Sequence, residues 1–259
     1  MALSQEKTEV FIMNFPVVRD QYFYPVYLNE LIDYYSYSVK EYVKLKNSAK
    51  EIADSIIKDV KYPFWHGAPD DTHVLNMYHG EYKWCKTVRE DFWDRGSMVI
   101  GTNKVGDCDG SSIATVTCLR AFGVTPQNVY VVFGLVRDAT TGTVLGGHAY
   151  VFCKDKSFKS DKYVLIETTL DTPPKQYPVV GSFEDCKKPY TYHNVIYDPE
   201  FLFNDQEFIQ VKAFEMKKRK ANFQKEEALT EAWQIPTKLY KLYMKSKIWK
   251  IKRALHLER

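Results

Sequence analysis

The sequence predicts an α+β fold, in which helices come first, one further helix leads into an antiparallel meander, and helices follow again. Residues 39–60 carry apolar side chains at helical three- and four-residue steps. A second helical segment at 107–122 precedes three short segments rich in β-branched and aromatic residues. From Asp205 to Arg259 the helical pattern returns, with an interruption near Pro236. Helices and antiparallel strands segregated in this way are typical of the α+β class.

The helix before the meander has clear expected ends. It begins at Asp107 or Cys108 and runs to about Phe122, where Gly123 suits the left-handed residue that often closes a helix. Polar, turn-rich connectors separate the predicted strands, which span residues 128–136, 147–153 and 163–169. Residues 61–105 contain many Pro and Gly residues and are predicted to be mostly loop, of the kind that often lines a site.

Length and composition indicate a globular protein with a basic C-terminal segment. The 259 residues are 45% hydrophobic, 15% aromatic and 27% charged, which excludes a wholly disordered or collagen-like chain. The net charge is +3, yet residues 204–259 alone hold 14 Lys and Arg against 7 Asp and Glu. We therefore expect a domain at 1–203, with a helical N-terminal part, and a basic helical extension at 204–259 docked on it. An anionic partner for that extension is the alternative interpretation.

Cysteine usage and hydropathy predict a cytoplasmic protein. The start of the chain does not resemble a secretory signal, and no run of about 18 apolar residues predicts a transmembrane segment. The five cysteines are odd in number and include no CxxC pair, which favours a reducing compartment: Cys85, Cys108, Cys118, Cys153 and Cys186.

Cys108 is the strongest candidate for a nucleophile. It lies at the predicted start of a helix, where the positive end of the helix dipole and the unbonded N–H groups favour a thiolate. The same N–H groups can stabilise an oxyanion. The flanking carboxylates of Asp107 and Asp109 oppose a further negative charge. A small buried hydrophobe is the competing interpretation of any single cysteine.

His148 is the candidate base, and two carboxylates compete to orient it. His148 opens a predicted strand directly after Gly146 and Gly147, where a substrate backbone can approach closely. Glu167 lies on the next predicted strand, and a suitable hairpin register would put both side chains on one face of the sheet. The alternative orienting residue is Asp171, which falls past the end of that strand.

These residues also carry a resemblance to a known family. Gly106-Asp107-Cys108-Asp109-Gly110, Leu119-Arg120-Ala121-Phe122-Gly123-Val124, Gly147-His148-Ala149-Tyr150 and Glu167-Thr168-Thr169 resemble, in order and spacing, the transglutaminase-like superfamily of papain-like cysteine enzymes. The resemblance covers about residues 49–171. It implies a nucleophile-bearing helix packed on an antiparallel sheet, with Cys108 as nucleophile, His148 as base and Glu167 as orienting acid. The family usually has Asp where this chain has Glu167, and often Trp where it has Tyr150.

The remaining candidates concern the oxyanion hole and metals. Besides the Cys108 N–H, a second oxyanion donor is sought at Asn103 or Trp93. No phosphate-binding loop or EF-hand is present, so no cofactor is expected. The spacings in the set His66, His73, His79 and Cys85 are wider than those of structural zinc sites, so no metal is expected either.

We therefore expect a cysteine-dependent acyl-transfer enzyme that hydrolyses a peptide, isopeptide or other amide bond of a peptide or protein substrate through a thioester. Two alternatives stay open, namely a protein cross-linking transglutaminase and a catalytically inactive binding or scaffolding module.

Overall fold

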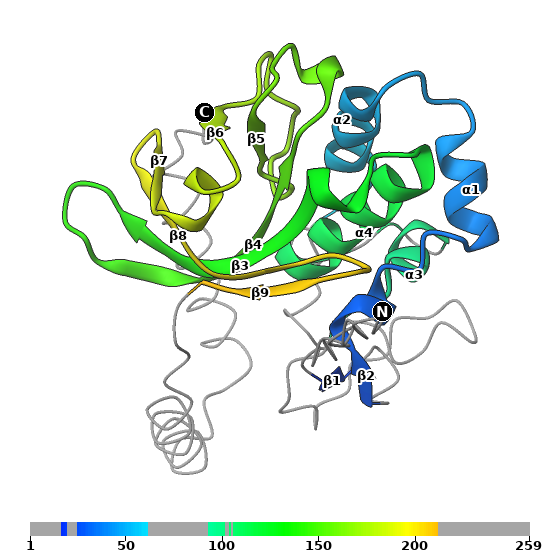
Figure 1. The fold of residues 1–259 in the computed structure, drawn as a ribbon, viewed down its shortest axis with the longest axis horizontal. Helices are drawn as coiled ribbons and strands as arrows, with labels where there is room; N and C mark the ends of the chain where they lie inside the picture. Colours follow the sequence, from blue (N-terminus) through cyan, green and yellow to red (C-terminus); the bar gives the residue numbers. More distant parts are fainter. Residues whose placement is uncertain (1–16, 20–24, 62–92, 102–103, 105, 212–259) are drawn as a thin grey trace, which may run out of the picture.

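The computed structural model describes residues 17–19, 25–61, 93–101, 104 and 106–211, and these form helices packed on a strongly curved antiparallel sheet (Figure 1). The α+β prediction is therefore confirmed. The helices are α1 (Tyr37–Val43), α2 (Ala49–Asp59), α3 (Gly96–Gly101) and α4 (Cys108–Phe122). The strands are β1 (Val17–Arg19), β2 (Pro25–Tyr27), β3 (Val129–Asp138), β4 (Val144–Cys153), β5 (Tyr163–Ile166), β6 (Val179–Gly181), β7 (Tyr190–Tyr192), β8 (Val195–Phe203) and β9 (Phe208–Gln210).

Helix α4 has the ends that the sequence predicts. Asp107 is its N-cap, and the Asp107 carboxylate accepts a hydrogen bond of 3.3 Å from the N–H of Gly110. Gly123 closes the helix with a φ of 108°, a left-handed conformation that a residue without Cβ adopts at little cost. Cys108 is consequently the first residue of a 15-residue helix.

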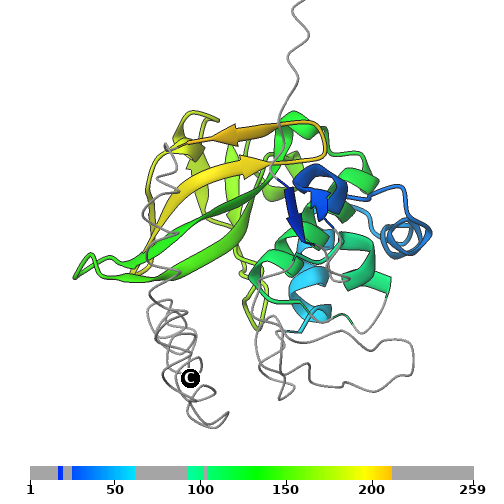
Figure 2. The same cartoon turned by 90° about the horizontal axis from the view of Figure 1, so that it is seen from below.

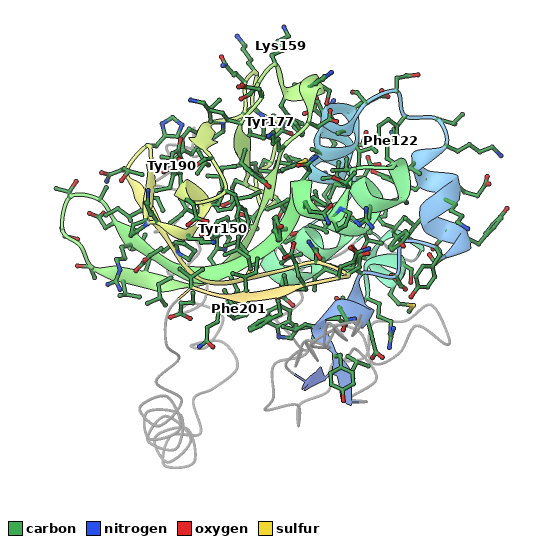
Figure 3. The ribbon with its side chains drawn as sticks, in the orientation of Figure 1. Phe122, Tyr150, Lys159, Tyr177, Tyr190 and Phe201 are labelled. Carbon is green, nitrogen blue, oxygen red and sulfur yellow. The ribbon has the colours of Figure 1, made fainter. Side chains whose placement is uncertain are left out.

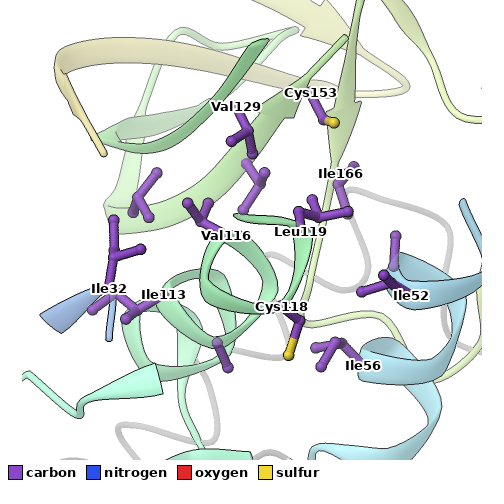
Figure 4. Close-up of a cluster of buried hydrophobic side chains, with 14 of the residues drawn as sticks. Ile32, Ile52, Ile56, Ile113, Val116, Cys118, Leu119, Val129, Cys153 and Ile166 are labelled. Carbon is purple, nitrogen blue, oxygen red and sulfur yellow. The ribbon is translucent and has the colours of Figure 1, made fainter. Parts of the chain in front are cut away.

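An aliphatic core surrounds α4 and holds it between the sheet and the other helices. Figure 4 shows Val116 and Leu119 of α4 between Val129, Cys153 and Ile166 of the sheet and Ile52 and Ile56 of α2. Each of these seven side chains is fully buried. At roughly 25 cal/mol per Å² of buried apolar surface, such packing holds the helix firmly against the sheet.

The larger sheet has the strand order β6-β5-β4-β3-β8-β7, and β9 pairs with β8. The β3–β4 hairpin extends well beyond the rest of the sheet (Figures 1 and 2). The sheet curls so far that its two edges approach each other, and the Tyr190 hydroxyl of β7 donates a hydrogen bond of 3.2 Å to the Val179 carbonyl of β6. The concave face is thereby enclosed.

That concave face holds a second core, which is mainly aromatic. Its buried members include Tyr130, Tyr150, Phe152, Tyr163 and Tyr197, and Figure 3 shows Tyr150 inside the curve of the sheet. Strand alternation separates the two cores. In β4, for example, Tyr150 and Phe152 face the aromatic core, whereas Val151 and Cys153 face the aliphatic core.

The helix predicted at 39–60 is in fact two helices. Helix α1 ends at Val43 and α2 begins at Ala49, after Ser48, whose hydroxyl accepts a hydrogen bond of 3.1 Å from the Glu51 N–H. A Ser followed three residues later by Glu is typical of a helix N-terminus, so a new helix begins here in place of one continuous helix. Leu45, a member of the predicted apolar stripe, lies in the break and is 82% exposed.

Strands β6 to β9 continue the sheet after residue 178, beyond the three strands that the sequence predicts. In β8, Pro199 pairs opposite Gly134 at a register irregularity. A Cβ at Gly134 would lie 2.2 Å from the Asp198 carbonyl oxygen, so the close approach of the two strands requires glycine there. Pro within a strand is rare away from such bulges, which explains why the pattern did not indicate a strand.

The helix expected from Asp205 does not begin there. The Asn204 side-chain oxygen accepts hydrogen bonds of 2.8 and 2.9 Å from the N–H groups of Gln206 and Glu207, which turns the chain back into β9. The first residues of the expected C-terminal extension thus belong to the sheet. The remainder of that extension lies outside the described residues. Helix α3 likewise falls in the segment predicted to be loop, and β1 pairs with β2 near the N-terminus.

None of the described helices is long and apolar enough to cross a membrane.

Candidate active site

The site is built around a buried pair formed by His148 of β4 and Glu167, the residue after β5. The His148 Nε2 atom lies 2.8 Å from Glu167 Oε2, and both residues are at most 5% exposed. An ionised carboxylate can only accept, so Nε2 is the donor and Nδ1 is the ring nitrogen left to exchange a proton with a substrate or a nucleophile.

The strand register explains this pairing. Val151 pairs with Ile166, and Phe152 pairs with Leu165. Continuing the same alternation puts His148 and Glu167 on the concave face of the sheet, at diagonal positions where long side chains can meet. The sequence left two possible registers, and this one brings Glu167 to the histidine.

Glu167 accepts four hydrogen bonds. One oxygen, Oε2, accepts from His148 and from the Tyr197 hydroxyl at 3.0 Å. The other, Oε1, accepts from the Thr169 N–H at 3.0 Å and from the Thr169 hydroxyl at 2.7 Å. A buried carboxylate with this many donors is held both in position and in its charged form.

The pKa of Glu167 reflects a balance between burial and these partners. Burial alone raises it, because a charged carboxylate is poorly solvated inside the protein. The charge of His148, the hydrogen bond from His148 and the two hydrogen bonds from Thr169 act in the opposite direction and outweigh burial. The pKa is therefore lowered from its ordinary value of 4.5, and Glu167 is an anion at neutral pH.

Two tyrosines enclose the pair within the aromatic core. The rings of Tyr150 and Tyr197 lie 6.3 and 6.4 Å from the His148 ring and 5.0 Å from each other. Burial raises the pKa of both phenols well above 10, so the Tyr197 hydroxyl remains a donor to Glu167. The Tyr150 hydroxyl is buried and has no hydrogen-bond partner among the described residues. The two tyrosine rings therefore pack in similar ways beside His148, but only the Tyr197 hydroxyl forms a hydrogen bond to a described residue.

The start of α4 lies beside the turn that follows Glu167. The Ser111 hydroxyl is 2.8 Å from the Thr168 hydroxyl and also donates to the carbonyls of Asp107 and Cys108 at 2.6 and 3.3 Å. Thr168 also lies 3.1 Å from the Ser112 hydroxyl. A short series of contacts therefore joins the backbone of Cys108 to the residue next to Glu167.

Cys108 differs from the other described thiols in its surroundings. It is half-buried, whereas Cys118, Cys153 and Cys186 are buried. Burial raises the pKa of Cys186 to about 12 and raises the pKa values of Cys118 and Cys153 further. These three thiols are therefore unreactive at neutral pH. Cys108 combines access to solvent with a position at the start of a helix.

The other candidates fall in different places. Asp171 lies with Ile57 and Lys61 at a cavity of about 110 Å³ between the end of α2 and the start of α4, and this cavity borders the site because Ser111, Thr168 and Thr169 also line it. Glu167, and not Asp171, bonds to His148.

The structure describes one of the two candidate oxyanion donors. Trp93 packs its ring 5.7 Å from Phe133 and 6.2 Å from Phe203, so its indole belongs to the core. Asn103 lies outside the described residues. The second oxyanion donor stays a prediction.

The set His66, His73, His79 and Cys85 also lies outside the described residues. Within the part of the chain that the structure describes, no group of three or more His, Cys, Asp or Glu side chains is arranged to hold a metal ion.

The sequence reasoning missed Tyr197 and Ser111. Tyr197 lies on β8, a strand that the sequence did not predict because it contains Pro199. No local pattern therefore linked Tyr197 to Glu167. Ser111 lies on α4 directly after the Gly106–Gly110 motif, and its position one helical turn after Cys108 is the signal that its hydroxyl can reach the Cys108 backbone.

Comparisons with known proteins give only distant likenesses. No family model matches the chain, and no curated protein matches it. Among solved structures, LapG from Legionella pneumophila is similar over 71% of this chain and 80% of its own, with 12% identity and a TM-score of 0.38. A protein from Cytophaga hutchinsonii described as a candidate cysteine protease is similar over 68% of this chain and 50% of its own, with 12% identity and a TM-score of 0.30.

Proposed function

We propose that this protein is a cysteine-dependent acyl-transfer enzyme that hydrolyses amide bonds of peptide or protein substrates, with Cys108 as nucleophile, His148 as base and Glu167 as orienting acid. The observation that carries the proposal is the buried His148–Glu167 pair, 2.8 Å apart, in a sheet on which the Cys108 helix packs. A carboxylate that holds one ring nitrogen of a histidine is the arrangement that orients a catalytic base toward a nucleophile.

The proposed mechanism assigns each group one task. The thiol proton of Cys108 passes to His148 Nδ1, and the thiolate attacks the substrate carbonyl. The Cys108 N–H and a donor from Asn103 or Trp93 stabilise the oxyanion. His148 then protonates the leaving amine as the C–N bond breaks, which leaves a thioester. Water attacks the thioester with His148 as base, and this step releases the acid and regenerates the thiol.

The buried Glu167 supports this cycle because its charge stabilises the imidazolium that forms twice per turnover. Tyr197 and Thr169 hold the carboxylate still, so the imidazole keeps one orientation. In the same proposal residues 1–203 form the main part of the catalytic domain, and residues 204–259 begin as its last strand and continue as a basic extension. The unbridged thiols of Cys118, Cys153 and Cys186 support a cytoplasmic location.

The test is thiol labelling combined with substrate cleavage. At about pH 6, iodoacetamide should label Cys108 much faster than any other thiol, because only a thiol of lowered pKa is ionised there. His148→Ala should slow this labelling, whereas Cys108→Ala should abolish both the labelling and the cleavage of fluorescein-labelled casein. Casein cleavage by Cys108→Ala at the wild-type rate would refute the proposal.

A second readout separates hydrolysis from cross-linking. Incorporation of a fluorescent primary amine into casein, in place of cleavage, would assign the chain to the transglutaminase alternative, because an amine would then replace water in attacking the thioester. Fast labelling without either reaction would favour a binding module that retains an activated thiol.

A further inference from the structure

We propose that the substrate binds as an extended peptide strand against the edge of β4 at Gly146 and Gly147, in line with β5. This inference rests on the proposed function, because it names the form in which that site takes its substrate. It comes from a mismatch in strand length: β4 runs from Val144 to Cys153, but β5 pairs only with its last three residues, from Val151 to Cys153.

Beside the first half of β4, the segment that follows β5 no longer continues as a paired strand. After Ile166 it turns, and the Thr168 hydroxyl bonds to Ser111 and Ser112 of α4. Among the described residues no strand pairs with β4 between Val144 and Tyr150 on the β5 side. This position, vacant among the described residues, begins next to His148 and close to the start of α4, where the candidate nucleophile lies.

The direction of the backbone groups follows from the hydrogen bonds nearby. The Leu165 N–H donates to Pro178, so Val164 and Ile166 direct their N–H and C=O groups toward β4, where they pair with Cys153 and Val151. Odd-numbered residues of this part of β4 therefore face the β5 side. Gly147 is odd-numbered and exposed, so its N–H and C=O point into the vacant position.

The two glycines leave room for an incoming chain. A Cβ at Gly146 would meet no described atom within 4 Å, and by alternation it would lie on the same face as His148. A Cβ at Gly147 would meet only the Phe133 ring, at 3.3 Å. An exposed strand edge with backbone donors and acceptors binds extended peptides by adding a strand, and the backbone bonds make this recognition largely independent of sequence.

The occupant that fits is therefore an extended, unfolded segment of a peptide or protein chain. A helix cannot offer its backbone groups, because they are already bonded within the helix. A peptide paired with Gly147 lies one residue from His148, so the strand addition brings the substrate backbone to the proposed base.

The first experiment uses hydrogen exchange on Cys108→Ala, which lacks the proposed nucleophile, and fluorescein-labelled casein as an unfolded probe. In the protein alone, the Gly147 amide should exchange rapidly, whereas the His148 amide, which faces β3, should be protected. Bound casein should slow exchange at Gly147 by at least about tenfold. Unchanged exchange at Gly147 under saturating casein, or no casein binding at all, would overturn the inference.

The second experiment compares two bulky substitutions on the same strand. Gly146→Leu fills the open space beside His148 and should raise KM for casein at least tenfold while kcat changes little, because the obstruction acts on binding. Val144→Trp puts bulk farther along the strand, at a side chain that is already 46% exposed, and should leave KM unchanged. Equal KM values for the two variants would refute the inference.

The two experiments separate failure of this inference from failure of the proposed function. If Cys108→Ala binds casein at Gly147 but the wild-type protein does not cleave it, the edge is a peptide site and the catalytic proposal fails. If the wild-type protein cleaves casein and Gly147 is not protected, the catalytic proposal stands and the strand-addition inference fails.

Discussion

The two faces of the sheet solve different problems with different side chains. The convex side, against the helices, is filled mainly by aliphatic residues such as Ile52, Val116 and Ile166, whose side chains contribute packing alone. The concave side is lined by aromatic residues, and among them Tyr197 directs its hydroxyl to a buried carboxylate. Tyrosine supplies both a large apolar ring and a polar end, so it can surround a charge and bond to it. The difference shows that the two faces of one sheet can hold different interiors, one mainly aliphatic and one built around a hydrogen-bonded carboxylate.

The largest expected effect follows from removing the charge on the concave face. Glu167→Gln keeps the shape of the side chain but cannot stabilise an imidazolium, so the turnover of casein should fall by up to about 10⁴-fold while the protein stays folded. Steady-state kinetics and circular dichroism measure the two properties. Asp171→Asn is the matched control and should change turnover less than threefold, because Glu167, and not Asp171, bonds to His148. The reverse order would transfer the orienting role to Asp171.

A truncation in the aliphatic core tests the convex face of the sheet. Ile52→Ala removes a fully buried side chain from the aliphatic core and should lower the free energy of unfolding by about 2–5 kcal/mol. Chemical denaturation measures this loss. The rate at which iodoacetamide labels Cys108 should stay the same below the unfolding transition. A large change in that rate would show that the two faces are not independent.

Two single-atom changes within the concave face sharpen the comparison further. Tyr197→Phe deletes a donor to a buried anion. It should lower the free energy of unfolding by about 1.5–3 kcal/mol and raise the activation free energy of turnover by the same range, because the transition state needs a fixed carboxylate. Tyr150→Phe removes a buried hydroxyl that has no partner among the described residues, so its cost should be close to zero or negative. Urea denaturation and the pH dependence of turnover distinguish the two variants. Equal effects would mean that the hydroxyl of Tyr197 acts through packing alone.

The smallest expected effect is a dependence of protein stability on low pH. The pKa of Glu167 in the folded protein is below its ordinary value of 4.5, so its charged form stabilises the fold. This stabilisation is complete above that ordinary value and is lost as the pH falls through the lowered pKa. The difference in Tm between the wild-type protein and Glu167→Gln should therefore be constant from pH 7 to about pH 5 and should shrink at lower pH. A difference that grows in acid would contradict the direction of the pKa shift.

The parts of the fold that the sequence predicted correctly are those with local signals. Asp107 and Gly123 mark both ends of α4, and the strand segments near His148 and Glu167 are rich in β-branched and aromatic residues. The parts that were missed depend on distant contacts. Pro199 is tolerated in β8 because Gly134 on another strand leaves space for it, and no local pattern contains that fact.

The candidate site divides in the same way. The residue types and order of Cys108, His148 and Glu167 suggested their roles, but the register that joins His148 to Glu167 depends on the pairing of Val151 with Ile166. Tyr197 was not predictable, because its strand was not. A hydrogen bond between residues 30 positions apart has no signature in either segment alone.

The place of Tyr197 on β8 also bears on how the protein folds. Ser111 and Thr168 are 57 residues apart, His148 and Glu167 are 19 apart, and Tyr197 follows Glu167 by another 30. Contacts between residues this far apart in sequence form slowly, because long loops must close first. During synthesis the β3–β4–β5 meander emerges before β8, so the Glu167 carboxylate gains its fourth donor late. In the nascent chain, the Glu167 carboxylate therefore has all four donors only after β8 has been made.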